Sequence, residues 1–241
     1  PMQAHKATLI NKVSFAGDVD LFRFALEEPQ QLSFVPGQYV ILTIPHSPLP
    51  VKRLYSIASP SSQSASFELL IKRVPGGIAS NYIEALTMGN KIEVVGPAGL
   101  FSLKNTPYNK VFLTTGTGIA PVRSFILSNP FHTQYYYLFW GMPFFRELYL
   151  LDELMGLAKK DPLLHVSICL SREEDLGGIP VEFHPFFNLG HIDNVVGKLI
   201  ASQPQNSLEY YICGRREVVE STREYLYNQT VDRSMVHFER Y

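Results

Sequence analysis

The sequence of 241 residues has little of several features that mark particular classes of protein. It contains two cysteines, Cys169 and Cys213, each inside an apolar run. They form neither a disulfide framework nor a CxxC pair, and they are too few to supply the four thiolates of an iron–sulfur cluster. The net charge is −1, which gives no support to nucleic-acid binding.

Long apolar runs are missing as well. No segment approaches the roughly 20 consecutive apolar residues that span a bilayer, and residues 1–6 lack the apolar stretch of a signal peptide. We therefore expect a cytoplasmic protein without a membrane partner. Hydrophobic residues make up 46% of the chain and charged residues 18%, a balance that predicts a packed core rather than disorder.

The pattern of the chain changes near residue 105. Before it, short β-rich runs separated by turn signals predict a barrel or a sandwich. The expected strands cover residues 9–13, 21–26, 66–74 and 91–95, with one extended region over 38–56 and a helix over 79–87.

Beyond residue 105, strands alternate with helices, which predicts a parallel, doubly wound sheet. The expected strands are residues 111–115, 135–140, 164–170, 209–213 and 234–241. The expected helices are residues 120–128, 147–159, 194–202 and 217–227.

A glycine-rich loop, Gly116-Thr117-Gly118-Ile119-Ala120-Pro121, joins the first of these strands to a helix. Glycines let a phosphate approach main-chain N–H groups, and a proline suits the first helical turn. Ligands bind at the carboxyl ends of such strands, so the loop is a candidate nucleotide site. The loop is neither GxGxxG nor a P-loop, and the alternative is a glycine-capped turn without a ligand.

The first half contains two further candidate motifs. In Arg53-Leu54-Tyr55-Ser56, the arginine suits a phosphate, and the tyrosine offers a flat face and a hydroxyl to a flavin. The serine hydroxyl is short enough to approach a ring nitrogen. Gly76-Gly77-Ile78-Ala79-Ser80 opens the predicted helix and is a second candidate anion site. The alternatives are an ordinary amphipathic strand and a hairpin-to-helix turn.

These motifs, followed by Cys213-Gly214 after a late strand and by Glu239-Arg240-Tyr241, occur in the order found in the ferredoxin–NADP reductase superfamily of flavoproteins. The chain resembles this family from about residue 6 to its last residue. The resemblance implies an antiparallel six-stranded FAD-binding barrel in residues 1–104. It also implies a five-stranded parallel α/β domain that binds NAD(P), in residues 105–241.

The resemblance also implies roles for single residues. Arg53 would bind an FAD phosphate, Tyr55 would pack on the flavin ring, and Ser56 would reach toward flavin N5. Further FAD contacts are implied for Leu54, Ile71, Lys72, Arg73, Gly77, Ile78, Ala79, Ser80, Thr117 and Tyr241. Contacts to NAD(P) are implied for Gly116, Thr117, Gly118, Ile119, Pro121, Ser171, Arg172, Cys213 and Gly214.

Four residues, Ser56, Cys213, Glu239 and Tyr241, are expected to take part in catalysis. The resemblance places Cys213 and Glu239 beside the nicotinamide, and Tyr241 over the flavin until nicotinamide displaces it. We expect Cys213 to contribute packing and polarity, because a lone cysteine on an apolar strand is usually a buried hydrophobe.

Ser171-Arg172 matches the pair that recognises the 2′-phosphate of NADPH in this family. The pair favours NADPH over NADH as the second cofactor, although the following Glu173, Glu174 and Asp175 dilute the positive charge.

The predicted activity is hydride transfer from NAD(P)H to bound FAD, with electrons passing on to a separate acceptor such as ferredoxin or flavodoxin. Two alternatives share the fold: a free-flavin reductase, and a non-catalytic electron-transfer subunit. No residue pattern indicates an oligomeric state.

Overall fold

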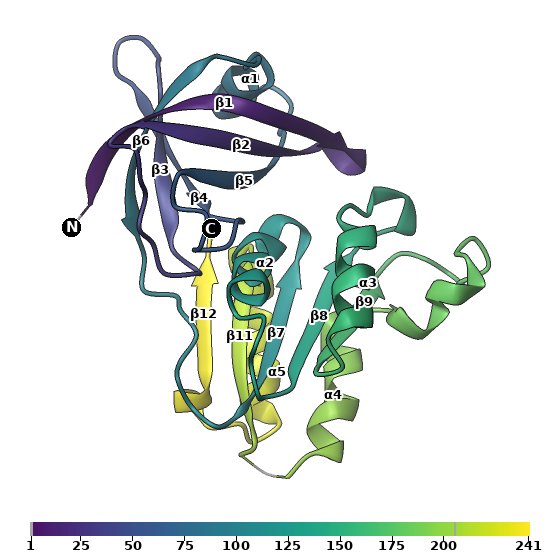
Figure 1. The fold of residues 1–241 in the computed structure, drawn as a ribbon. Helices are drawn as coiled ribbons and strands as arrows, with labels where there is room; N and C mark the ends of the chain where they lie inside the picture. The colour runs from purple at the N-terminus through teal and green to yellow at the C-terminus, as the bar shows by residue number, and fades with distance from the viewer. Residues whose placement is uncertain (1, 205) are drawn as a thin grey trace. The chain divides into compact units, whose positions relative to one another are not determined.

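The computed structural model describes residues 2–204 and 206–241 (Figure 1). The chain forms two compact units. One comprises the residues up to 104 together with 120–130, and the other comprises residues 105–119 and 131–241. Helix α2 (Ile119–Ser128) therefore lies almost wholly in the first unit, although in the chain it follows the first strand of the second unit.

The first unit is a curled antiparallel sheet of six strands, as predicted. In sequence order these are β1 (Gln3–Phe15), β2 (Val19–Glu28), β3 (Tyr39–Ile44), β4 (Val51–Ser56), β5 (Ser66–Lys72) and β6 (Lys91–Ala98). They pair in the order β4-β3-β6-β1-β2-β5. A bridge between Ile57 and Leu69 joins the end of β4 to β5, so that the two edges of the sheet meet.

Alternating apolar residues on the strands form the core of this unit. Phe24 on β2 stacks on Phe67 of β5 with ring centroids 5.5 Å apart, and Ile83 of helix α1 (Ile78–Glu84) packs into the same core. The extended region expected over 38–56 is a hairpin in which β3 and β4 pair. Prolines in the connecting residues 45–50 explain the break, because proline has no N–H to donate to a sheet.

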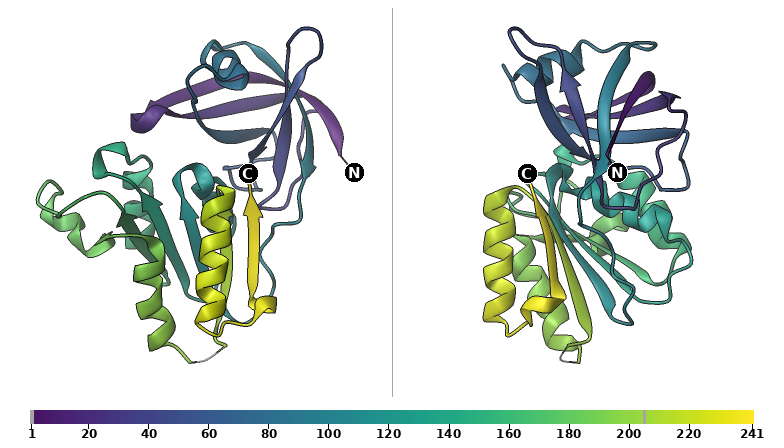
Figure 2. Two further views of the ribbon diagram at one scale, coloured as in Figure 1. Left: turned by 180° about the vertical axis from the view of Figure 1, so that it is seen from behind. Right: turned by 90° about the vertical axis from the view of Figure 1, so that its left-hand side faces the viewer.

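The second unit is a parallel sheet covered by helices. Its strands are β7 (Asn109–Thr115), β8 (Tyr136–Met142), β9 (Leu164–Leu170), β10 (Phe187–Leu189), β11 (Leu208–Gly214) and β12 (Val236–Arg240), in the order β10-β9-β8-β7-β11-β12. Its helices are α3 (Leu151–Lys160), α4 (Ile192–Ser202) and α5 (Arg216–Asn228). Figures 1 and 2 show α4 and α5 on one face of this sheet and α3 on the other.

Short 3₁₀ turns connect some of these elements. They cover Ala16–Asp18, Gly116–Gly118, Phe145–Glu147, Val181–Phe186 and Arg233–Met235. Within the described residues, no helix has both the length and the apolar character needed to cross a membrane.

The prediction of five strands in the parallel sheet was wrong, because β10 adds a sixth. Phe187 pairs with Ile168 of β9 at the edge of the sheet. Three residues that follow a 3₁₀ turn are too few to show a period-2 pattern in the sequence. The buried Phe187 ring packs edge-on against Phe145 at 5.5 Å between centroids, so β10 is fixed to the sheet edge by a side-chain contact as well.

A buried ion pair links β7 to β11. Lys110 Nζ lies 2.5 Å from Glu209 Oε2, and both residues are 3% exposed. The Thr106 hydroxyl donates to the same carboxylate at 2.6 Å, and His237 Nε2 lies 3.0 Å from its other oxygen. Burial alone would raise the pKa of Glu209, but the hydrogen bonds from Lys110, Thr106 and His237 outweigh it and lower the pKa.

This lowered pKa predicts a dependence of stability on pH. The charged Glu209 stabilises the fold above its unfolded-state pKa near 4.5, and this contribution is lost as the pH falls through the lower folded-state value. Glu209→Gln should cost about 3–5 kcal/mol at neutral pH, because it leaves the Lys110 charge buried without its partner. Its melting temperature should also change less than that of the wild type between neutral pH and about pH 4.

Melting temperatures measured across this pH range test the prediction. Glu224→Gln serves as the control, because it removes a carboxylate from an exposed position on α5. Parallel curves for wild type and Glu209→Gln would show that the buried cluster does not titrate with unfolding.

Candidate cofactor-binding sites

Strand β4, which comes first in the strand order of the antiparallel sheet, carries the Arg53–Ser56 motif. Arg53 is exposed and has no ion-pair partner within the described residues, and its Nη1 donates to the Lys52 carbonyl at 2.9 Å. Tyr55 is half-buried against the barrel core, and this burial raises its pKa despite the nearby Arg53 charge. Ser56 is 7% exposed, whereas Leu54 is 53% exposed. The Arg53 guanidinium and the neighbouring Tyr55 ring together fit a cofactor that carries both a phosphate and an aromatic ring.

The turn before α1 supplies an open stretch of backbone. Gly76 has φ +73°, and a Cβ added there would meet no atom within 4 Å. Gly77 precedes the helix, and Ser80 Oγ accepts a hydrogen bond from the Val74 N–H at 2.7 Å. The Ser80 hydroxyl thus closes the turn, while the bare backbone at Gly76 leaves room for a phosphate. Ile78 and Ala79 form the first helical turn.

The three predicted FAD contacts at the end of β5, Ile71 to Arg73, have different surroundings in the structure. Ile71 is a core residue and Lys72 is exposed. The Arg73 guanidinium lies among three carboxylates, those of Asp18 (3.6 Å), Asp20 (3.1 Å) and Glu84 (3.2 Å). Arg73 therefore ties β2 and α1 together. The sequence motif missed this set of partners, which come from positions far apart in the chain.

The glycine loop after β7 is shaped by close packing in the second unit. The Thr114 hydroxyl donates to the Cys213 carbonyl at 2.8 Å. A Cβ at Gly118 would lie 2.5 Å from the Thr114 oxygen and 2.6 Å from the Cys213 carbonyl oxygen, so only glycine fits. At Gly116, with φ +53°, an added Cβ would meet nothing within 4 Å, and the carbonyl accepts from Trp140 Nε1 at 2.9 Å.

This loop leads into the first turn of α2. Thr117 is half-buried, and Ile119 and Pro121 are buried at the helix start. The first N–H groups of a helix lack intrahelical partners and carry partial positive charge. An open glycine next to these donors fits the pyrophosphate of a dinucleotide.

The ends of β11 and β12 bring the last predicted group together. Cys213 pairs with Glu239, and Gly214 with Arg240, in parallel register. Cys213 is fully buried, and its Sγ lies 3.0 Å from the Tyr241 hydroxyl. Burial raises the pKa of Cys213, which keeps the thiol protonated and supports a role in packing and polarity.

The Ser171–Arg172 pair follows β9 on a backbone held by β8. The Ser171 N–H donates to the Met142 carbonyl and the Arg172 N–H to the Pro143 carbonyl, both at 3.0 Å. The Arg172 side chain is exposed, and no carboxylate pairs with it within the described residues. The structure thus offers a fixed backbone with a free guanidinium.

Two of the acidic residues that follow Arg172 accept hydrogen bonds from backbone N–H groups. Glu173 Oε1 accepts from the Phe145 N–H at 2.9 Å, and Asp175 Oδ1 accepts from the Gly177 N–H at 2.7 Å. Neither bond was predicted from the sequence, where these carboxylates count only as negative charge.

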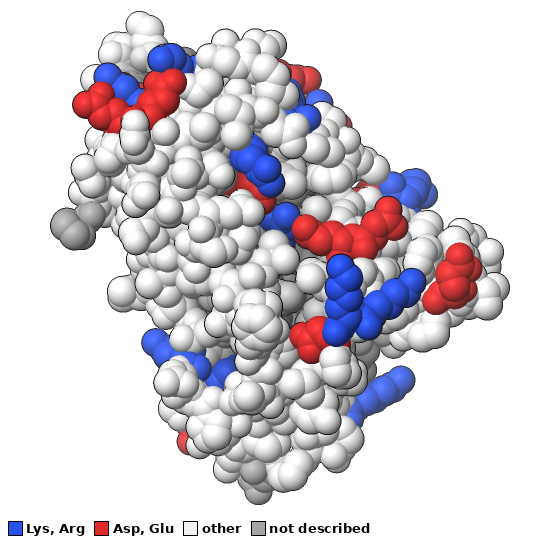
Figure 3. Space-filling view, viewed as in Figure 1, with Lys and Arg blue, Asp and Glu red and all other residues white. Residues whose placement is uncertain are grey.

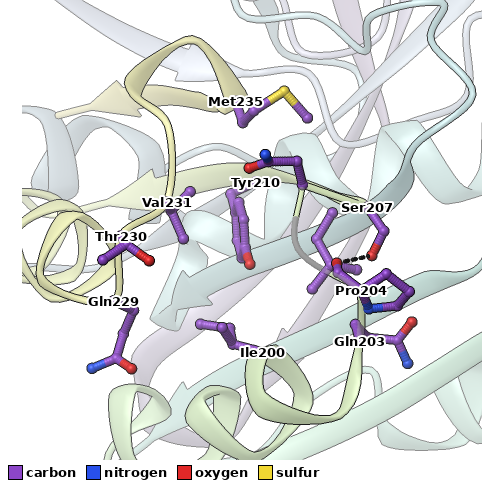
Figure 4. A pocket seen from close by; sticks show the side chains of 11 residues that line it. Ile200, Gln203, Pro204, Ser207, Tyr210, Gln229, Thr230, Val231 and Met235 are labelled. Carbon is purple, nitrogen blue, oxygen red and sulfur yellow. Dashed lines mark hydrogen bonds between the residues drawn. The ribbon is translucent and has the colours of Figure 1, made fainter.

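The structure also contains a cavity of about 190 Å³ near the amino end of β11. Tyr210 lies among Ile200, Val231 and Met235 in its wall (Figure 4). Its lining residues, all in the described parts of the chain, carry no charge, and none of the predicted site residues is among them. On the face shown in Figure 3, acidic and basic side chains are intermingled, with no large patch of one sign.

Two family models of known proteins match most of the chain. An oxidoreductase FAD-binding domain model matches residues 6–103, and an oxidoreductase NAD-binding domain model matches residues 112–224. The chain belongs to the ferredoxin–NADP reductase superfamily. It is an oxidoreductase that uses FAD and a nicotinamide nucleotide, which confirms the family, the activity class and the cofactors predicted from the sequence.

Three proteins similar to this chain are a ferredoxin reductase, a monooxygenase component and a cytochrome P450 reductase. A ferredoxin–NADP reductase B of Sorangium cellulosum is 32% identical over 212 residues, which cover 86% of this chain and 85% of that protein. The reductase component of a Rhodococcus jostii propane 2-monooxygenase is 27% identical over 249 residues, and the match covers 64% of its length. A crystal structure of an Amycolatopsis cytochrome P450 reductase matches 100% of this chain and 70% of its own, with 25% identity and a TM-score of 0.85.

The packing at Gly118 yields a prediction for the reductase. Gly118→Ala should destabilise the protein by about 1–3 kcal/mol, because the new Cβ overlaps with Thr114 and the Cys213 carbonyl. Gly156→Ala is the matched control, because a Cβ at this position in α3 meets nothing within 4 Å. The control should stabilise by about 0.5–1 kcal/mol, since alanine favours a helix interior. Thermal unfolding of both variants decides the matter, and equal shifts would contradict the packing argument.

Proposed function

We propose that this reductase takes its hydride from NADPH in preference to NADH and delivers electrons to a separate ferredoxin- or flavodoxin-type protein. The preference for NADPH is carried by Arg172. Its exposed guanidinium has no ion-pair partner within the described residues, and its backbone is pinned to the end of β8. A free guanidinium on a rigid backbone suits a phosphate. Ser171 would add a hydroxyl contact to the same 2′-phosphate.

The residues on β4 and before α1 would hold FAD. When bound, FAD supplies the capacity to take up a hydride and release electrons, and the protein supplies placement and exclusion of water. Arg53 would bind a phosphate, Tyr55 would pack its ring against the flavin, and Ser56 would offer its hydroxyl to a ring nitrogen. The open backbone at Gly76–Ser80 would receive the pyrophosphate. Leu54 and the strand residues Ile71 to Arg73 would line the cofactor.

The residues at the carboxyl ends of β7 and β11 would hold the dinucleotide. Gly116 to Pro121 would bind its pyrophosphate through backbone N–H groups, with Thr117 close to both cofactors. Cys213, Gly214 and Glu239 would line the nicotinamide pocket, where the protonated thiol adds polarity without charge. The Tyr241 ring would cover the flavin and give up its contact with Cys213 when nicotinamide arrives, a small gating step.

The names of the relatives support a separate acceptor. The Sorangium protein is named for ferredoxin, and the Rhodococcus protein is one component of a monooxygenase system. The decisive experiment is anaerobic reduction of the FAD-loaded protein by NADPH and by NADH, followed by a screen of ferredoxins, flavodoxins and free flavins as acceptors. Flavin lost on gel filtration would support a free-flavin reductase. Flavin that neither nucleotide bleaches would support a non-catalytic subunit.

The role of Arg53 predicts a loss of FAD affinity in Arg53→Ala. Removing one charge-assisted phosphate contact should cost about 1.5–3 kcal/mol, or roughly one to two decades in the dissociation constant. Lys52→Ala, an exposed neighbour on the same strand, should change affinity much less. The measurement is FAD titration of the apoprotein by fluorescence. Equal affinities for Arg53→Ala and wild type would remove Arg53 from the FAD site.

The role of Arg172 predicts a change in nucleotide preference. Arg172→Ala should lower kcat/KM for NADPH by about one to two decades and leave NADH nearly unchanged, because only NADPH carries the 2′-phosphate. Arg172→Lys should retain part of the preference, and Lys160→Ala, at the end of α3, should leave both values unchanged. Steady-state kinetics with both nucleotides provide the test. Equal losses for NADPH and NADH would assign Arg172 to a shared contact or to structure.

A further inference from the structure

Helix α2 follows the predicted nucleotide loop in the chain and packs within the unit that carries the predicted flavin motif. It follows directly on the glycine loop, yet from Ala120 onward it is part of the first unit. Its buried face includes two polar residues, Arg123 at 8% exposure and Ser124 at 0%. Charged side chains are rarely this buried without a dedicated partner.

The partner of Arg123 is a buried carboxylate in the barrel. Arg123 Nη1 lies 2.7 Å from Glu68 Oε2 on β5, and Glu68 is 3% exposed. Arg23 on β2 binds the other oxygen of Glu68, with Nε at 3.0 Å and Nη2 at 2.8 Å. Burial would raise the pKa of Glu68, but Arg123 and Arg23 outweigh it and keep the carboxylate charged.

The same helix is bonded to the segment that follows the β4 motif. Arg123 Nη1 donates to the Ala58 carbonyl at 2.9 Å, two residues after Ser56. The Ser124 hydroxyl donates to the Ser59 carbonyl at 2.7 Å. One further bond, 3.0 Å long, runs from the Ser61 N–H to Ser128 Oγ.

A directional, buried ion pair suits positioning better than stability. Replacing such a pair by apolar side chains is often neutral or stabilising, so a gain in stability does not by itself account for this one. Hydride transfer depends on accurate placement, because a misplacement of about 1 Å at the reacting atoms can lower the rate about 10²-fold.

We propose that Arg123 is a positioning residue for hydride transfer. Through Glu68 and the Ala58 carbonyl, it holds the helix that begins at the nucleotide loop to the segment that continues the flavin motif. This proposal rests on the proposed function. It assigns a catalytic effect to a residue that touches neither cofactor.

The test compares two arginines that share one carboxylate. Arg123→Gln removes the link between α2 and Glu68, whereas the control Arg23→Gln removes a charge from the same carboxylate without touching α2. In anaerobic stopped-flow experiments, Arg123→Gln should slow the limiting rate of flavin reduction by NADPH about tenfold or more. Its FAD content and its dissociation constant for NADP⁺ should stay within about twofold of wild type, since no binding contact is lost. Arg23→Gln should retain the wild-type rate.

A second measurement needs no nucleotide. In hydrogen exchange followed by mass spectrometry, Arg123→Gln should speed exchange in peptides that cover residues 116–128, and Arg23→Gln should not. This readout judges the anchoring of α2 even if neither nucleotide reduces the wild type, a result that would overturn only the proposed function.

Ser124→Ala provides a milder variant if Arg123→Gln fails to retain FAD. It removes one hydrogen bond to the Ser59 carbonyl and should slow flavin reduction about threefold to tenfold, with unchanged FAD content. A wild-type rate and wild-type exchange in these variants would overturn the proposal. Equal slowing by Arg123→Gln and Arg23→Gln would overturn it too, because the effect would then come from the charge of Glu68 alone.

Discussion

The nucleotide half of the reductase depends on how closely three backbones approach one another at the carboxyl end of β7. A Cβ at Gly118 would overlap with the Cys213 carbonyl of β11. A Cβ at Gly141 of β8 would lie 2.9 Å from the Thr115 side chain, and one at Gly214 would lie 3.2 Å from the Thr115 hydroxyl. Because these glycines carry no side chains, the backbone N–H groups of the loop stay open for the phosphate contact proposed above.

The flavin half is organised by polar groups that lie inside the barrel or at its turns. Arg73 gathers three carboxylates from β2, its preceding turn and α1, and Glu68 is shared by two arginines. These networks satisfy charges that would otherwise be costly to bury. Arg53 is different, since among the residues that the structure describes its guanidinium bonds only to the neighbouring Lys52 carbonyl. The barrel thus commits its structural arginines to carboxylates and leaves one exposed on β4.

Much of this could be predicted from local patterns. The change near residue 105, the alternation of strands and helices and the glycine loops all depend on neighbours in the chain, and the family order of the motifs added the cofactors. Edge strand β10 could not be predicted, because three residues carry no period. The turn within 38–56 was not predicted, because the residues on both sides of it favour extended structure. The prolines between them are the signal that could have identified it.

The polar networks were beyond sequence patterns for another reason. Glu68 and Arg123 are 55 positions apart, and each alone looks like an ordinary surface charge. Glu173 counted against a phosphate site in the sequence, but in the structure its carboxylate accepts the Phe145 N–H. The effect of such a charge depends on the donor it meets, and that donor is set by the packing of β8 against β9.

The burial of both cysteines has a consequence for the chemical durability of the reductase. Thiolates, and not thiols, react with peroxide and alkylating reagents. Burial and the nearby Asp193 carboxylate raise the pKa of the Cys169 thiol to about 12, and burial also raises the pKa of Cys213. Both sulfurs are therefore inaccessible and protonated at neutral pH. In the folded protein, neither thiol therefore offers the thiolate that peroxides and alkylating reagents attack.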